Sequence, residues 1–414
     1  MARRSQFQPG HEPLEARSDL TLKSKHVTGT FASLNPTLAH YSPTGHPPAV
    51  EPEQDQVSSQ SDIEHLWRSR DNRKGRHALR VSHRISSQDH VTTPPLTRSA
   101  PAICKGLLNM ATYAPYWDVS WLVATTFTLG SVIWVINAFF VWLPLVRPET
   151  DFAGESLVGG GVTAFIGATI FEVGSVLLLL EAVNENQTGC FGWALEMVVS
   201  KTGDQGGHAW TEIRPDMQDC RHHHANRRSF LRGRHGNESG TAHHVSRVVP
   251  ASDGRSFRWM PSVKELRTHY IHELGFLASA IQLLSASVFW IAGLTGLPGI
   301  YNHLSSGLAD GIYWAPQIVG GAGFILSGLL FTLETQSRWY KPAWHVLGWH
   351  IGVWNFIGGI GFTLCGALGP ASSHSGVEYQ ATLATFWGSW AFMIGSTIQW
   401  YESLQKHPVE KKTE

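Results

Sequence analysis

Six stretches of this chain are long and apolar enough to cross a lipid bilayer. Each holds about 20 or more mostly uncharged residues, which matches a hydrocarbon core of roughly 30 Å at 1.5 Å of helix rise per residue. The mean hydropathy of −0.10 and the net charge of zero hide these stretches, because long polar segments dilute the averages. We expect membrane helices over residues 119–143, 157–181, 271–296, 312–334, 344–368 and 382–402.

The second stretch of each consecutive pair follows one pattern. A glycine opens it, a Gly/Ser pair stands seven and eight residues later, and a glutamate follows fourteen residues after that first glycine. Internal repeats indicate a fold made from copies of one supersecondary unit. The sequence therefore predicts an all-α fold, a six-helix transmembrane bundle built from three hairpin repeats. The three copies run from Gly167 to Glu181, from Gly320 to Glu334 and from Gly388 to Glu402.

Polar segments flank and interrupt the predicted hairpins. They show almost no apolar periodicity, so they cannot bury enough apolar surface to offset the entropy of ordering, and disorder is expected. We predict a disordered cytosolic tail at 1–115, membrane hairpin 1 at 116–183, a mostly disordered cytosolic insertion at 184–260, hairpin 2 at 261–335, hairpin 3 at 336–403 and a cytosolic tail at 404–414.

The start of hairpin 2 carries a helix N-terminus signature. Ser262 and Glu265 have the spacing of a capping box, and no helix breaker follows before Gly275. We therefore expect the third helix to begin in the cytosol and to continue directly into the membrane.

The distribution of basic residues predicts the orientation. The loops inside the hairpins, 145–156, 297–311 and 369–381, hold one Lys or Arg, Arg147, and the other 31 lie elsewhere. Because cytosolic loops carry the excess of Lys and Arg, both termini are expected in the cytosol and the three hairpins are expected to be parallel. The sequons at Asn186 and Asn237 then face the cytosol and should carry no glycan.

Small residues spaced by seven form one stripe along each returning helix. Such stripes let membrane helices approach closely, so we assign them to helix packing. The positions are Gly167, Gly174, Gly320, Ser327, Gly388 and Gly395.

The repeated carboxylates Glu181, Glu334 and Glu402 are expected at the cytosolic ends of their helices, where a negative charge opposes the helix dipole. Two interpretations fit. The favoured one is a set of interfacial ion pairs, and the other is a ring of carboxylates around a cytosolic mouth, as in cation-selective pores. The basic residues expected nearby are Arg267, Arg338, Lys341 and Lys406.

Glu172 lies nine residues before Glu181, roughly 13 Å deeper along the predicted helix. An ionisable group at that depth is costly and is a functional hypothesis by default; the alternative is a protonated carboxyl satisfied by a neighbouring helix. The matching residues of the other two repeats are Ile325 and Met393, so this charge breaks the repeat. The candidate partners within the membrane are His350, Gln282, Asn355 and Asn137.

His269, His272 and Glu273 stand at positions i, i+3 and i+4 near the start of the third helix. On a helix this spacing places two imidazoles and a carboxylate near one face, which could bind zinc with a further histidine. The alternative is a set of polar side chains at the membrane interface, which is the favoured interpretation, and no cofactor is predicted.

The pattern F-x-x-G-S recurs near the middle of two returning helices, at Phe171 to Ser175 and at Phe392 to Ser396. It resembles the YrhK-like two-helix membrane domain, and the layout over about 119–403, without the insertion, is similar to uncharacterised fungal integral membrane proteins that carry this domain. The middle hairpin departs from the pattern, with Leu326, Ser327 and Gly328. The resemblance implies membrane hairpins and carries over no activity.

The sequence favours a non-enzymatic membrane protein, structural or regulatory, whose partners are the lipid bilayer and, through its basic segments, anionic lipid headgroups or cytosolic proteins. It shows no nucleotide-binding or hydrolase motif and indicates no nucleic-acid partner, so an enzyme is the less favoured class. The first alternative is a channel or transporter that uses Glu172 and the repeated carboxylates. The second is a membrane-embedded metal enzyme that uses His269, His272 and His350.

Overall fold

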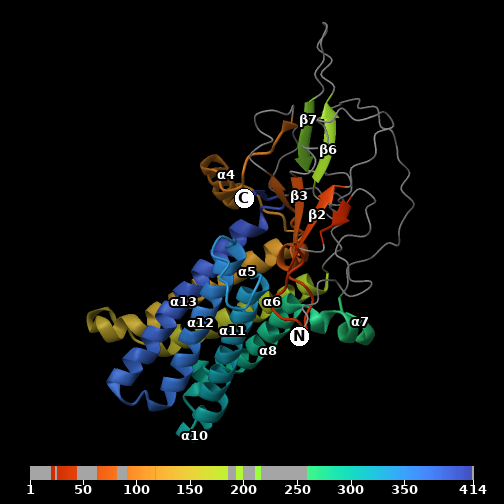
Figure 1. Cartoon of the computed structure of the whole chain (residues 1–414). Coiled ribbons are helices and arrows are strands. Elements are labelled where there is room, and N and C mark those ends of the chain that lie inside the picture. Colours follow the sequence, from red (N-terminus) through yellow and green to blue (C-terminus); the bar gives the residue numbers. More distant parts are fainter. Residues whose placement is uncertain are drawn as a thin grey trace, which may run out of the picture.

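Six helices of 20 residues or more dominate the computed structural model, which describes residues 20–23, 26–43, 63–81, 91–116, 118–184, 193–198, 210–215 and 259–412. They contact one another in chain order, and the last also packs against the first, so that they surround a common axis (Figure 1). The helices are α5 (Val119–Val146), α6 (Gly161–Val183), α8 (Leu274–Thr295), α11 (Ala315–Glu334), α12 (Leu347–Leu368) and α13 (Ser375–Ser403).

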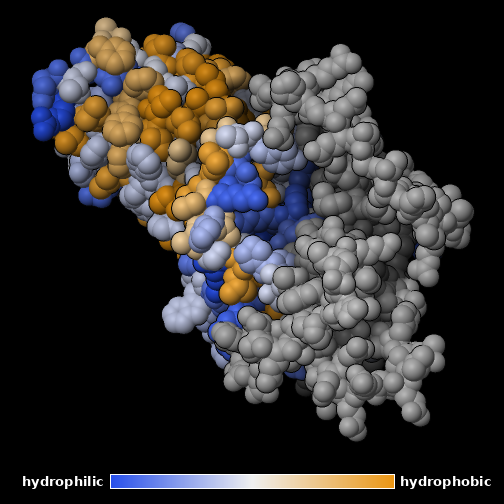
Figure 2. Space-filling view, turned by 90° about the horizontal axis from the view of Figure 1, so that it is seen from above, coloured by the Kyte–Doolittle hydropathy of each residue, from blue (hydrophilic) through white to orange (hydrophobic). Residues whose placement is uncertain are grey.

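Five of these helices are long and apolar enough to cross a membrane. With the turns that extend them, the candidate spans are Val119–Val146, Glu155–Val183, Leu274–Thr295, Ser306–Glu334 and Leu347–Ala371. The remaining helix, α13, is less apolar because Ser, Thr, Gln and Glu occupy many of its positions. In Figure 2 hydrophobic residues gather over the helical part of the molecule, with hydrophilic residues at both of its ends. The protein is therefore mostly helical, with five candidate membrane spans.

Short helical turns connect the long helices at the end away from the sheet. π-helical turns precede two of the returning helices, η3 (Glu155–Gly160) before α6 and η5 (Asp310–Trp314) before α11. The other connecting turns are η2 (Pro148–Thr150), α9 (Pro298–Tyr301), α10 (Ser306–Ala309) and η6 (Gly369–Ala371).

A five-stranded sheet covers the opposite end of the bundle. The prediction of an all-α fold is therefore wrong for this part of the chain. Its order is β1 (Leu20–Leu22), β2 (Leu38–Pro43), β3 (Ile63–Arg68), β4 (Ala78–Val81) and β8 (Val409–Lys411). Neighbouring strands are antiparallel, except that β4 and β8 are parallel, with Leu79 opposite Val409. Segments more than 300 residues apart thus share one sheet.

Several parts of the predicted disordered segments are regular structure. In the tail at 1–115, these include strands β1 to β4, α2 (Ser69–Arg73) and α4 (Ala100–Thr112). In the insertion, β6 (Trp193–Val198) and β7 (Trp210–Pro215) pair with each other, and β7 pairs with β5 (Val91–Thr92). The prediction of disorder is wrong for these residues, because short strands gain their stability from partners far away in the sequence, which local periodicity does not reveal. The sequons Asn186 and Asn237 lie outside the described residues.

The axis of the bundle is filled by aromatic side chains. Each of the six long helices contributes one buried ring to a single cluster, which we call the aromatic layer. Trp134 stands edge-on to Phe362, with 4.8 Å between ring centroids, in the geometry that the ring quadrupoles favour. The layer consists of Trp134, Phe171, Phe289, Phe324, Phe362 and Phe392.

The start of hairpin 2 is partly as predicted. The capping box is confirmed, since the Ser262 side chain accepts from the Glu265 N–H and the Glu265 carboxylate accepts from the Ser262 N–H. The helix does not continue into α8, however. It ends as α7 (Val263–Thr268), and after η4 (Tyr270–His272) the extended residue Glu273 precedes α8. Asn35 binds the chain at this break: its N–H donates to the His272 carbonyl and its side chain donates to the Glu273 carboxylate.

Candidate functional site

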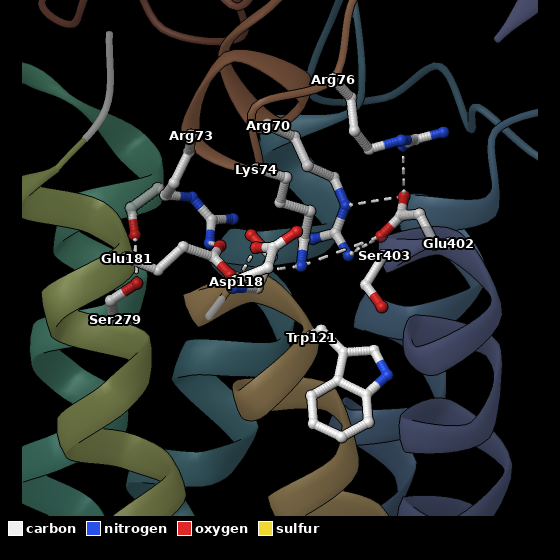
Figure 3. Close-up of polar contacts among 12 residues, drawn as sticks. Arg70, Arg73, Lys74, Arg76, Asp118, Trp121, Glu181, Ser279, Glu402 and Ser403 are labelled. Atoms are coloured by element: carbon white, nitrogen blue, oxygen red, sulfur yellow. Dashed lines mark hydrogen bonds and ion pairs between the residues drawn. The ribbon is translucent and has the colours of Figure 1, made fainter. Parts of the chain in front are cut away.

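The connection between β3 and β4 inserts basic side chains into the end of the helix bundle (Figure 3). We call residues 69–76 the docking segment. It consists of α2 and a turn at Gly75, whose φ of +60° favours glycine and whose N–H binds the Asn72 carbonyl. The whole segment is buried, and Lys74 is only 1% exposed. A short helix closed by a tight turn thus directs several long cationic side chains toward the bundle.

The repeated carboxylates Glu181, Glu334 and Glu402 receive these cations. They stand at the ends of α6, α11 and α13, and none is more than 2% exposed. We call these three residues the acidic ring, because side chains of the docking segment bridge them. Burying an ionised carboxylate costs several kcal/mol unless it is paired and hydrogen-bonded, so the pairing decides whether this arrangement is stable.

Two arginines make the shortest contacts with the acidic ring. Arg73 donates to Glu181 at 2.5 Å and to Glu334 at 3.0 Å, and so connects two of the three helices. Arg70 donates through Nε and one terminal nitrogen to both oxygens of Glu402, at 3.2 and 2.8 Å. Such two-point arginine–carboxylate contacts fix geometry as well as charge.

Two further cations complete the cluster. Arg76 bridges Glu402 at 3.0 Å and Asp71 at 2.6 Å. The Lys74 Nζ lies 3.6 Å from Glu181 and 4.0 Å from Glu402, beyond hydrogen-bonding distance of both. Four cations thus face four carboxylates, and the charges of the cluster balance.

The pKa directions distinguish the arginines from the lysine. Burial alone would lower the pKa of Arg70 and Arg73, but the neighbouring carboxylates outweigh burial and raise both above the ordinary arginine value. For Lys74, burial together with the positive charges of Arg70 and Arg73 outweighs the attraction of the carboxylates and lowers the pKa to about 8. The arginines are therefore favourably paired, whereas the lysine charge is held at a cost.

The predicted ion pairs exist, but their partners differ from those expected. Lys406 pairs with Asp118 and donates to the Lys74 carbonyl, and Arg338 donates to the Tyr340 hydroxyl. Arg267 and Lys341 are exposed. The true partners lie in a segment that was expected to be disordered. A signal was present there, because residues 68–76 hold five Lys or Arg, with Gly75 marking a turn.

A small cavity of about 30 Å³ lies between the docking segment and the aromatic layer. Arg70 and Arg73 border it on one side, and Phe171 and Phe392 on the other. This volume holds about one or two water molecules. The polar side chains that line it are Ser131, Gln282, Asn355, Ser396 and Gln399. The structure thus brings two of the predicted intramembrane polar residues, Gln282 and Asn355, to the axis.

Glu172 lies elsewhere, on the seam between α6 and α8. It is half-buried and accepts a hydrogen bond from Ser287 on α8 at 2.8 Å, while its second oxygen has no hydrogen-bond partner in the structure. The neighbouring Thr169 accepts from the Trp290 ring on the same seam. Glu172 therefore contacts the third long helix through Ser287, which is not one of the four predicted partners.

The other two candidate partners are engaged near the ends of the helices. His350 contacts the Trp344 carbonyl at 2.7 Å through Nε2 at the start of α12. Asn137 donates to the Gly160 carbonyl and to Thr163, which fastens α5 to the start of α6. Neither residue is brought to Glu172 by a contact in the structure.

The predicted metal ligands do not share a helical face, because the chain between His269 and Glu273 is not one continuous helix. Glu273 is buried and binds Asn35 and Ser69 instead. Within the described residues, no group of three or more His, Cys, Asp or Glu side chains could hold a metal ion.

The small-residue stripes pack against the first helix of the same hairpin. A Cβ atom at Gly167 would lie 2.8 Å from the Trp134 ring nitrogen, and one at Gly320 would lie 2.6 Å from the Phe289 Cβ. Gly388 approaches Gly361, and the Ser327 hydroxyl donates to the Ala278 carbonyl at 2.9 Å. Gly174 and Gly395 pack on Phe127 and on Asn355.

Comparisons with known proteins identify no relative: no family model, no curated protein and no solved structure matches this chain. The resemblance to the YrhK-like domain stays a prediction.

Proposed function

We propose that this chain is a multi-pass membrane protein with a structural or regulatory role, which holds an extramembrane sheet against one face of a membrane bundle. In this proposal α13 crosses the membrane with the five more apolar helices, and the six form three parallel hairpins. The closed order of helix contacts and the equivalent positions of the acidic ring support this arrangement. The less apolar α13 is compatible with a span, because its buried Ser389, Ser396 and Gln399 turn away from lipid.

The sheet and the docking segment are proposed to face the cytosol. The excess of Lys and Arg at this end of the bundle supports that orientation. Glycosidase treatment of the expressed protein should leave its mobility unchanged. A glycan on Asn186 or Asn237 would show that the orientation is reversed.

The buried charge cluster carries the functional proposal. Its cations come from the connection between two strands, and three of its four carboxylates come from the ends of three helices, up to 332 residues away. The pairs therefore do not stabilise the sheet alone or the bundle alone. They fix one to the other, as expected of a membrane protein that positions a cytosolic module.

Tryptic cleavage tests the docking directly. Only cleavage after the basic residues of the docking segment is measured, and all of these residues are buried when the segment is docked. Replacing Glu334 and Glu402 by Gln should accelerate cleavage within residues 69–76 in membranes with an accessible cytosolic face. Glu149→Gln is the matched control, since Glu149 pairs with Arg147 at 64% side-chain exposure in a connecting turn. Unchanged cleavage in the double variant would contradict the proposal.

A second function has one observation in its favour. The countercharges of the acidic ring come from a separate segment, and amide side chains line the cavity beneath it, which is compatible with a cation pathway closed by the docking segment. The aromatic layer favours the first function, because it fills the axis below the cavity. Cation flux into proteoliposomes after Arg70, Arg73 and Lys74 are changed to Gln would favour the pathway, and its absence would favour the anchor.

A further inference from the structure

A pocket of about 390 Å³ lies beside the docking segment. Its walls are α4, the start of α12, the last turns of α13 and the residues that lead into β8. The volume is in the range of small-molecule binding sites. In Figure 1, α4 lies beside the sheet at the end of the bundle.

One side of this pocket is apolar. Ile103 and Leu107, four residues apart on α4, face it and are 40% and 56% exposed. Leu347 of α12 and Ile398 of α13 continue the same surface. The wall is held in place by Gly106, where a Cβ atom would lie 2.6 Å from the Tyr401 ring. Exposed apolar side chains around a cavity indicate an apolar ligand.

The other side of the pocket is charged, with three arginines and three carboxylates in its lining. Arg68 and Arg76 are already paired with Asp71, Glu402 and Glu410. Arg98 differs from them: it is exposed, donates to the His345 carbonyl, and forms no ion pair with any carboxylate in the part of the chain that the structure describes. Glu410 attracts this charge without a direct ion pair, so Arg98 is the arginine of the pocket that is least tightly held by carboxylates.

The pocket lies at the level of aromatic residues typical of a membrane boundary. Trp339, Tyr340 and Trp344 precede α12 and are 67%, 56% and 76% exposed. Exposed Trp and Tyr at helix ends occupy the headgroup level of a bilayer. This step rests on the membrane placement proposed above, and it brings Arg98 to the depth of lipid phosphates.

We propose that this pocket binds an anionic phospholipid, with its phosphate on Arg98 and part of an acyl chain along Leu107 and Ile398. A free anion would leave the apolar wall uncovered, and a zwitterionic lipid would be held more weakly because its own cation competes for the phosphate. Basic pockets at the cytosolic ends of membrane helices bind lipid headgroups in this way. The inner end of the pocket includes Arg76 and Glu402, so the bound lipid would border the buried charge cluster.

Native mass spectrometry of the full-length protein in neutral detergent tests the site, with phosphatidylglycerol, phosphatidylcholine and inorganic phosphate as probes. Arg98→Gln should weaken phosphatidylglycerol binding about ten- to a hundredfold, the worth of charge-assisted hydrogen bonds. The matched control is Lys105→Gln, an exposed cation of α4 outside the pocket lining. Leu107→Trp should fill the pocket and abolish binding, whereas Leu108→Trp, one residue further along, should not.

Three results would overturn the lipid site. The first is equal retention of phosphatidylglycerol and phosphatidylcholine. The second is an equal effect of Arg98→Gln and Lys105→Gln on phosphatidylglycerol binding, and the third is displacement of phosphatidylglycerol by inorganic phosphate. Tryptic protection of residues 69–76 should persist in Arg98→Gln. Loss of lipid with intact protection therefore separates this inference from the docking proposal. Intact lipid binding in Glu334→Gln, whose carboxylate lies outside the pocket lining, separates them in the other direction.

Discussion

Arg73→Met removes the cation that joins two members of the acidic ring. The substitution leaves Glu181 and Glu334 buried without their closest partner, and breaking a buried ion pair in this way costs about 3–5 kcal/mol. The cost acts on docking, because Arg73 and its two partners belong to separate parts of the fold. The population with the docking segment released should therefore rise about 150- to 4,000-fold.

The labelling rate of a thiol introduced by Ser69→Cys measures this opening, with the native cysteines replaced. Ser69 is 3% exposed, so the thiol reacts only when the segment leaves the bundle. Arg147→Met is the control, because Arg147 pairs with Glu149 at 68% side-chain exposure, where an ion pair contributes about 0–1 kcal/mol.

A triple variant separates charge from packing. Adding Glu181→Gln and Glu334→Gln to Arg73→Met removes the uncompensated charges, and replacement of a whole buried pair is often close to neutral. Most of the protection at position 69 should return. A labelling rate that is unchanged by Arg73→Met, or that stays fast in the triple variant, would refute the electrostatic account of docking.

Three further predictions follow from other contacts. Lys74→Met should loosen docking less than Arg73→Met does in the same thiol assay, because burial lowers the pKa of Lys74 and its charge is held at a cost. Glu172→Leu should lower the free energy of unfolding in detergent by about 0.5–1.5 kcal/mol, the net contribution of one hydrogen bond, because Ser287 loses Glu172 and keeps only its bond to the Leu283 carbonyl. Glu172→Gln, which can still accept from Ser287, should have a smaller effect, and equal effects of the two substitutions would contradict this role of the hydrogen bond. Burial would raise the pKa of Glu64, but hydrogen bonds from Lys23, Lys412 and His40 lower it to about 2. The stability that this carboxylate gives the sheet is therefore present above pH 4.5 and is lost as the pH falls toward 2. Acid unfolding of Glu64→Gln followed by circular dichroism should lack this component.

The sequence predicted the long helices well, because their signal is local. The expected spans 119–143 and 344–368 agree with α5 and α12 within about three residues at each end. Apolar runs of this length need no distant partner to be recognised. The capping box at Ser262 was also correct for the same reason, since both of its residues lie within one turn.

The site was only half predictable. The acidic ring was visible as a repeat, but its partners were not, because Arg70 and Arg73 lie in a polar segment whose structure depends on strands β3, β4 and β8. The prediction of a continuous third helix was wrong for a similar reason. No residue between Ser262 and Gly275 breaks a helix by itself, and the break lies where the chain binds Asn35, more than 200 residues earlier.

The pairing of β8 with β4 also sets an order of assembly. During synthesis, Arg68 can pair with Glu410 only after 342 further residues have been made, and Arg70 can pair with Glu402 only after 332. At about 5–20 residues per second of synthesis, that interval is roughly 20 to 70 s. During it the basic side chains of residues 68–76 have no complete set of carboxylates, so the segment cannot reach its buried position early. The sheet therefore closes through β8 only after the six long helices have been synthesised.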